Sequence, residues 1–220
     1  MRNIIPATMG GLLLALSTFS SASADTALDL WAQGKYEEAI ASGLADKSAD
    51  GLSVAARAAT TEMSLHAMPC LECVRRAEDL SRKALAAEPK AAVPSFCLAA
   101  ALAYHGRMVG TINTKPADIG SEARNTIEEA LAAHPNDARL MSAMAIWNFE
   151  VVRVAGSMLS RIVYGATMDR GLALFDQAFR LSPNDTLMNF QYGMSLAAYD
   201  PDEYRSKIEA AWGRVVAARP

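Results

Sequence analysis

Apolar residues recur along this chain with the spacing of helices, and small residues recur at fixed places among them. Three segments contain two small residues seven positions apart, followed by a large apolar residue and a proline. They are Ala77…Ala84-Leu85-x-x-x-Pro89, Ala123…Ala130-Leu131-x-x-x-Pro135 and Gly171…Ala178-Phe179-x-x-x-Pro183. Small residues seven apart lie on one face of a helix and let a neighbouring helix approach closely. Since proline cannot continue a helix, each segment predicts where a helix ends.

The residues around these segments predict turns and further helices. Turn-forming pairs follow the three prolines: Lys90-Ala91, Asn136-Asp137 and Asn184-Asp185. Near the N-terminus, Gly34-Lys35-Tyr36-Glu37-Glu38-Ala39-Ile40 has a glycine where one helix stops and acidic residues where the next begins. No segment shows the alternation typical of a strand, so we expect an all-α chain with at least about 60% helix.

This arrangement resembles the tetratricopeptide repeat (TPR) family. Gly34-x-Tyr36-x-x-Ala39 is similar to the middle of a TPR motif, and the three proline-ended segments are similar to its second helix. Gly193 falls near the first-helix glycine of the last repeat. The resemblance covers residues 25–220 and implies a TPR-like α-solenoid of about five antiparallel helix pairs.

The repeats are longer than those of the family, which are about 34 residues. Pro89 and Pro135 are 46 positions apart, and Pro135 and Pro183 are 48 apart. Glycine and proline in residues 106–120 predict that the first excess forms a loop. The second excess contains no proline and predicts one elongated helix from Ala138 to about Val163. Such enlarged repeats resemble the periplasmic TPR subunits associated with TRAP-type transporters and the regulator-of-microtubule-dynamics repeat proteins.

The N-terminus has the pattern of a secretory signal peptide. A basic start at Arg2 precedes an apolar run, Ile4 to Leu16, and small residues that include Ala22 and Ala24. We expect residues 1–24 to be cleaved after Ala24 and the mature chain to be periplasmic or secreted. The apolar run is shorter than the ~20 residues of a membrane span. No later uninterrupted apolar stretch of the chain reaches that length either. A buried N-terminal helix is the alternative interpretation.

Composition and charge exclude several classes of protein. The 220 residues are 51% hydrophobic, which excludes a disordered chain. The net charge of −3 argues against a nucleic-acid partner, because such proteins carry a basic surface. The sequence contains no G-x-S-x-G, no H-E-x-x-H and no phosphate-binding glycine loop. We therefore expect no enzyme and no cofactor, although catalytic groups from distant positions can still meet in space.

A narrow polar strip runs along the predicted long helix between two apolar sides. It contains Glu150, Arg153, Ser157, Arg161 and Tyr164, at spacings of 3, 4, 4 and 3. One interpretation is a solvated face with a Glu150–Arg153 ion pair. Another is a groove in which Arg153 and Arg161 hold an anionic or polar ligand. A buried structural network is the third.

The cysteines allow three interpretations. Cys70 and Cys73 open a predicted helix, where a disulfide, a redox-active thiol or a metal site could form. The nearby Met63, His66 and Met68 would suit Cu(I), or Zn²⁺ if sulfur ligands dominate. The chain lacks the βαβ setting of thioredoxins, so we expect a Cys70–Cys73 disulfide and no metal. Cys97 is expected to be a buried free thiol, ~15 Å from Cys73.

Two functions follow from these patterns. Stacked helix pairs can curve into a surface that binds a peptide or a partner domain, which makes the protein an interaction scaffold or adaptor. Alternatively, the 138–165 helix and the 106–120 loop enclose a pocket, and the protein carries a solute or an apolar small molecule. The pocket would explain the enlarged repeats. The partner in either case is unidentified.

Overall fold

The structure is a computed structural model that describes residues 20–66, 70–109 and 116–218. Of these residues 85% are helical and none forms a strand, which confirms the predicted all-α class. The helices of the described chain are α1 (Ser20–Ala32), α2 (Tyr36–Asp46), α3 (Ala49–Leu65), α4 (Leu71–Ala87), α5 (Ala92–Val109), α6 (Pro116–Ala133), α7 (Ala138–Leu159), the π-helical turn η1 (Ser160–Tyr164), α8 (Met168–Leu181), α9 (Thr186–Tyr199) and α10 (Arg205–Ala217).

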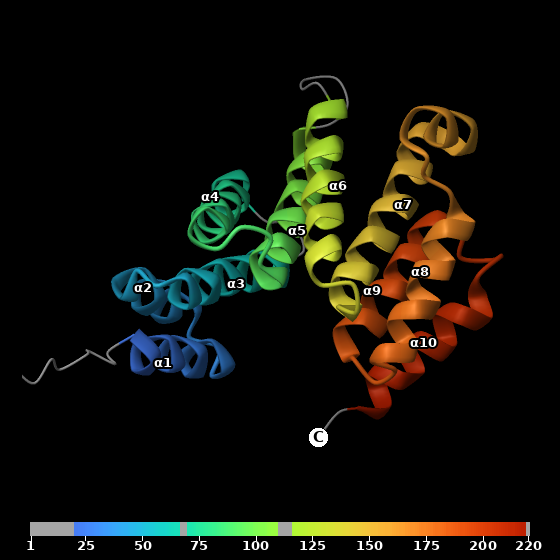
Figure 1. Cartoon of the computed structure of the whole chain (residues 1–220). Helices are drawn as coiled ribbons and strands as arrows, with labels where there is room; N and C mark the ends of the chain where they lie inside the picture. Colours follow the sequence, from blue (N-terminus) through green and yellow to red (C-terminus); the bar gives the residue numbers. More distant parts are fainter. Residues whose placement is uncertain (1–19, 67–69, 110–115, 219–220) are drawn as a thin grey trace, which may run out of the picture.

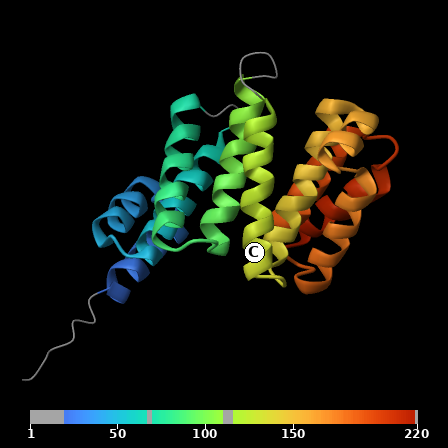
Figure 2. The same cartoon turned by 45° about the horizontal axis from the view of Figure 1, so that its top comes forward.

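The helices form five successive pairs, from α1 and α2 at one end to α9 and α10 at the other (Figures 1 and 2). Successive odd-numbered helices contact one another: α1 packs on α3, α3 on α5, α5 on α7 and α7 on α9. The described even-numbered helices form no comparable row. Successive pairs therefore approach one another most closely through their odd-numbered helices. The solenoid curves toward that side, so the odd-numbered helices form its inner face.

The predicted helix ends and turns of the repeats are confirmed. Each of the three prolines lies two residues beyond a helix end: Pro89 after α4, Pro135 after α6 and Pro183 after α8. The turn residues Asp137 and Asp185 cap the next helices, because their carboxylates accept hydrogen bonds from the amides of Leu140 and Met188, at 2.9 Å each. These caps satisfy amide groups that have no partner within the helix.

The recurring small residues lie where helices meet. The alanines that precede the helix ends, Ala84, Ala130 and Ala178, are at most 1% exposed. This confirms which helix positions of each repeat were expected to face a neighbouring helix. If the assignment were shifted by one or two residues, these alanines would face water.

Ala130→Leu should overpack the contact made by α6 and lower the free energy of unfolding by about 1–3 kcal/mol. Ala130 is 0% exposed, so three added carbon atoms have no space to occupy. The matched control is Ala132→Leu on the exposed side of the same helix, expected to change stability by less than about 0.5 kcal/mol. Urea unfolding of both variants measures the difference. Equal stabilities would mean that the repeat phase is misassigned.

The predicted loop over residues 106–120 is wrong for most of its length. α5 continues to Val109, and α6 already begins at Pro116, so only residues 110–115 lie outside the described helices. Gly106 is part of α5, and its α-carbon faces Ile119 of α6: a β-carbon there would lie 3.8 Å from the Ile119 side chain. The extra residues of this repeat therefore lengthen two packed helices, because the glycine lies where they meet.

The predicted single helix from Ala138 to Val163 is also wrong. The helix is interrupted at Gly156, whose φ of 77° and ψ of 160° are not helical. A π-helical turn follows and ends at Gly165, which has a φ of 64°. Both glycines adopt positive φ values that side chains with a β-carbon rarely allow. The chain therefore turns back at the end of α7 instead of extending the helix.

The predicted signal peptide falls mostly outside the described residues, which begin at Ser20. α1 runs through the expected cleavage point after Ala24 to Ala32, so cleavage there would leave α1 as residues 25–32. α1 contacts α2 and α3, and its residue Ala27 is fully buried.

Candidate functional site

The first two residues of the predicted polar strip form an ion-paired group. The Arg153 guanidinium donates to the Glu150 carboxylate at 2.8 Å, as the spacing predicts. The other oxygen of Glu150 accepts a hydrogen bond from Arg107 of α5 at 2.5 Å. Glu150 therefore links α5 to α7, and its charge is shared by two arginines.

The remaining residues of the strip separate, because the helix is interrupted at Gly156. Ser157 and Arg161 line a surface pocket of ≈ 460 Å³. Tyr164 instead packs into the core between α5, α6 and α7, where its carbonyl accepts a hydrogen bond from Arg124 at 3.3 Å. The five residues do not form one continuous site.

The pocket lies between the end of α7, the start of α8 and the end of α9. Its polar lining comes from Ser157, Arg161, Thr167 and Asp169, and its apolar lining from Val152, Met158, Ile162, Met168 and Tyr199. Such a mixture of opposite charges and apolar side chains suits a small amphipathic molecule.

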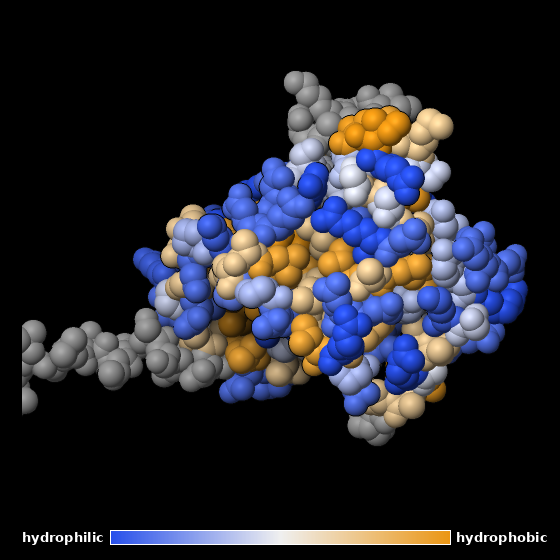
Figure 3. All heavy atoms as spheres, turned by 45° about the vertical axis from the view of Figure 1, so that its right-hand side comes forward, coloured by the Kyte–Doolittle hydropathy of each residue, from blue (hydrophilic) through white to orange (hydrophobic). Residues whose placement is uncertain are grey.

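Large apolar side chains are exposed beside this pocket, at the end of α7 and in η1. We call this group the α7 tip; it consists of Val154, Met158, Leu159, Ile162 and Val163. Met158 and Ile162 are 77% and 74% exposed. Figure 3 shows an apolar patch at this end of the molecule. Apolar side chains on two sides of a helix usually lie against other elements, but no described element covers the tip.

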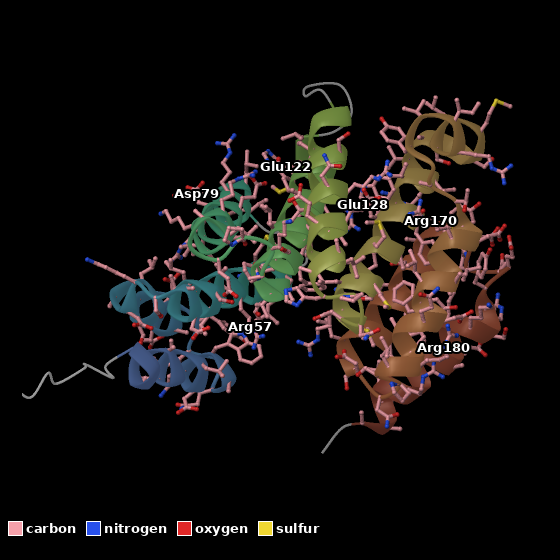
Figure 4. The ribbon with its side chains drawn as sticks, viewed as in Figure 1. Arg57, Asp79, Glu122, Glu128, Arg170 and Arg180 are labelled. Atoms are coloured by element: carbon pink, nitrogen blue, oxygen red, sulfur yellow. A yellow bond between two sulfur atoms is a disulfide. The ribbon has the colours of Figure 1, made fainter. Side chains whose placement is uncertain are left out.

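A cation without a carboxylate partner lies on the inner face. The Arg57 guanidinium of α3 stacks on the Trp31 indole of α1, 5.0 Å from the ring centroid (Figure 4). Trp31 is held in place by a hydrogen bond from its indole nitrogen to Thr61 at 3.0 Å. Among the described side chains, Arg57 has no ion pair, whereas the neighbouring Arg139 pairs with Asp185.

Burial lowers the pKa of the Arg57 guanidinium from its ordinary value, and the charge of Arg139 lowers it further, while Cys97 acts in the opposite direction. The side chain stays charged near neutral pH, since arginine titrates far above it. The environment of Arg57 therefore disfavours a charge that nothing in the described chain neutralises. No sequence pattern signals this site, because the stacking partners are 26 residues apart.

Comparisons with known proteins identify the fold. No family model matches the chain, and no curated protein matches it. Among solved structures, it is similar to a thermophilic TPR protein of Thermus thermophilus, with a TM-score of 0.66 and 14% identity, over 91% of this chain and 92% of that one. The fold is TPR-like. At this identity the similarity shows the fold alone, and the sites above are features of this chain.

The TPR-like solenoid brings Cys70 and Cys73 together at the start of α4. Their sulfur atoms are 2.14 Å apart and their α-carbons 5.1 Å apart, the arrangement of a disulfide. Cys97 is buried in α5 as a free thiol. The structure agrees with the predicted pairing. Met68, part of the alternative metal site, lies outside the described residues, and within them no group of three acidic, histidine or cysteine side chains is placed to hold a metal ion.

Cys97 should react with an alkylating reagent only after unfolding. Burial raises the pKa of its thiol to about 11, so the thiolate that reacts is scarce at neutral pH and becomes abundant only as the pH approaches that value. Mass spectrometry of unreduced mature protein should find no label in the native state and one label, on Cys97, in denaturant. Three labels would mean that Cys70 and Cys73 are reduced.

Proposed function

We propose that this TPR-like protein is an exported interaction scaffold whose inner face binds an acidic segment of a protein partner. Arg57 is the observation that carries the proposal. It is partly buried, stacked on Trp31 and without a carboxylate among the described residues. Removing a charge from water costs free energy unless a partner compensates, and a carboxylate of a bound protein would supply that compensation.

Other features of the odd-numbered helices support a protein partner. Large apolar side chains are exposed on several odd-numbered helices: Leu28 on α1, Leu65 on α3, and Leu187, Phe190 and Met194 on α9. Exposed apolar side chains and an arginine on one row of helices are typical of a protein interface. The scaffold acts by binding, and we assign it no catalytic residue.

The test compares Arg57→Gln with Arg180→Gln in affinity capture from the native host. Arg180 is exposed on α8 and has no ion pair in the described chain (Figure 4), so it matches the charge change away from the inner face. We expect Arg57→Gln to capture at least about tenfold less partner protein than the wild type, and Arg180→Gln to capture the wild-type amount. Equal capture by both variants, at equal melting temperatures, would contradict the role of Arg57.

We also propose that the scaffold works in the periplasm or outside the cell. The signal-peptide pattern of residues 1–24 and the Cys70–Cys73 pair support this location, because disulfides persist in oxidising compartments. In the described chain no helix is long and apolar enough to cross a membrane. N-terminal sequencing of the exported protein should read Asp25-Thr26-Ala27; a start at Met1 would contradict export by cleavage.

The pocket at the end of α7 favours a second function, as carrier of a small amphipathic molecule. Its volume of ≈ 460 Å³ is within the range of ligand pockets, and Arg161 and Asp169 offer one charge of each sign. Native mass spectrometry of protein purified from its host separates the two proposals. A retained small molecule that is lost in Arg161→Gln supports the carrier. Bare protein mass together with a captured protein partner supports the scaffold alone.

A further inference from the structure

We propose that the α7 tip binds the surface of a lipid bilayer that contains anionic phospholipids. Four of its five apolar side chains lie close together on one helical turn, since Met158 and Ile162 are four positions apart, as are Leu159 and Val163. All four are more than half exposed. This interaction is separate from the partner site at Arg57 and does not rest on it.

The tip is an ordered element, although its apolar side chains are in water. Ser160, between them, is fully buried and donates a hydrogen bond to the carbonyl of Ser157 at 3.1 Å. The amide of Ala166, also fully buried, donates to the carbonyl of Ser160 at 3.1 Å. The same short segment thus has an anchored side and an exposed apolar side. The exposed side is therefore held out from the body of the protein by its own packing.

The charges around the tip fit an anionic surface. The tip segment itself, residues 154–165, contains one charged side chain, Arg161. Its charge is positive, although the whole chain carries −3. Arg161 is exposed and has no ion pair among the described residues, and Arg170 lies near the same end of α8 (Figure 4). Each arginine near an anionic bilayer favours binding, while the apolar side chains enter the interface.

Shape and charge favour a bilayer over other occupants. Met158 and Ile162 edge a pocket of ≈ 460 Å³, which has the size of a small-molecule site, whereas a bound peptide segment needs a groove of its own length. A second copy joined through the same patch would bring two Arg161 side chains together, and like charges across an interface oppose association. A bilayer accepts an exposed apolar element and places its phosphate groups level with Arg161.

Vesicle sedimentation of the mature protein tests the proposal. We expect binding to vesicles of phosphatidylcholine mixed with phosphatidylglycerol and much weaker binding to phosphatidylcholine alone. Met158→Glu/Ile162→Glu should weaken binding about a hundredfold, because two apolar side chains no longer enter the interface. Leu159→Glu/Val163→Glu should do the same without changing the lining of the pocket. Arg161→Gln should weaken binding about fivefold.

Matched controls make the same changes elsewhere. Phe190→Glu/Met194→Glu alters two exposed apolar residues on α9, and Arg180→Gln removes an exposed arginine at the other end of α8. Both controls should bind vesicles as the wild type does. The tip variants should keep the wild-type melting temperature, because the substituted side chains are exposed, and should still capture the partner of the inner face.

Three results would overturn the proposal. The first is equal binding of wild type and tip variants to the mixed vesicles, or no binding of either. The second is equal loss in the tip variants and in the α9 control. The third is a wild-type dimer, seen by sedimentation velocity, that becomes a monomer in Met158→Glu/Ile162→Glu, because the patch would then join two copies. Failure of any kind leaves the Arg57 test unaffected, since that test measures protein capture.

Discussion

Phe175→Ala should lower the free energy of unfolding by about 3–5 kcal/mol, the usual cost of removing a buried aromatic side chain. Phe175 is 0% exposed and lies at the centre of the aromatic cluster that joins α7, α8 and α9. Its ring centroid lies 5.8 Å from that of Phe149, 5.7 Å from that of Phe179 and 4.7 Å from that of Tyr192. Truncation leaves a cavity between two helix pairs, and the surrounding helices can close it only in part.

Urea unfolding followed by circular dichroism measures the loss. Phe190→Ala, on α9 and 48% exposed, is the matched control and should cost about 0.5 kcal/mol. Because neighbouring pairs of a solenoid depend on one another, the loss should lower the stability of α9 and α10 in hydrogen exchange as well. Similar stabilities of the two variants would mean that the aromatic cluster is not the core between these helices.

Gly43→Ala should destabilise the N-terminal pairs by about 3 kcal/mol, the upper end of the cost of overpacking. A β-carbon at position 43 of α2 would lie 2.3 Å from the backbone carbonyl oxygen of Gly51 in α3. A side chain could rotate out of the way, but a carbonyl inside a helix cannot, so the two helices must separate.

The control for Gly43 is Gly213→Ala in α10, where a β-carbon would meet no atom within 4 Å. Alanine there should stabilise the protein by about 0.5–1 kcal/mol, because it favours the helix without a clash. Thermal unfolding of both variants should therefore give shifts of opposite sign. A stabilising effect at both positions would show that α2 and α3 do not approach as closely as the structure indicates.

The helices and the residues at which they begin and end could be predicted, because the signals for them are local in the sequence. A proline two residues beyond a helix, an aspartate at the cap position and a small residue such as Ala130 at a helix contact each act within one turn of the chain. The same holds for Cys70 and Cys73, which are three positions apart. These features fix the fold class without any knowledge of distant contacts.

The failures concern features that depend on neighbours far along the chain. Glycine is tolerated within helices, so Gly106 and Gly156 look alike in sequence. Gly106 stays helical against Ile119, whereas Gly156 interrupts α7, and Ser160 and Ala166 beyond the break are buried. The apolar pattern of the α7 tip predicts which side chains favour burial. It does not show whether another element packs against them.

The candidate sites illustrate the same limit. The strip from Glu150 to Tyr164 rests on an uninterrupted helix, and the break at Gly156 divides it between an ion pair, a pocket and the core. Arg57 carries no sequence signal, because its significance lies in the Trp31 ring beneath it and in the absence of a described carboxylate beside it. Both facts depend on how α1 and α3 pack.

The proposal that the inner face binds a protein partner is tested most directly by photo-crosslinking in the living host. A photoreactive phenylalanine analogue replaces one exposed residue at a time. Leu28 and Phe190 are exposed on odd-numbered helices, and Leu44 and Val216 are exposed on even-numbered helices. We predict one discrete protein adduct from the first two positions, abolished by Arg57→Gln, and none from the other two. Adducts of equal yield from all four positions, or adducts only from Leu44 and Val216, would contradict the proposal.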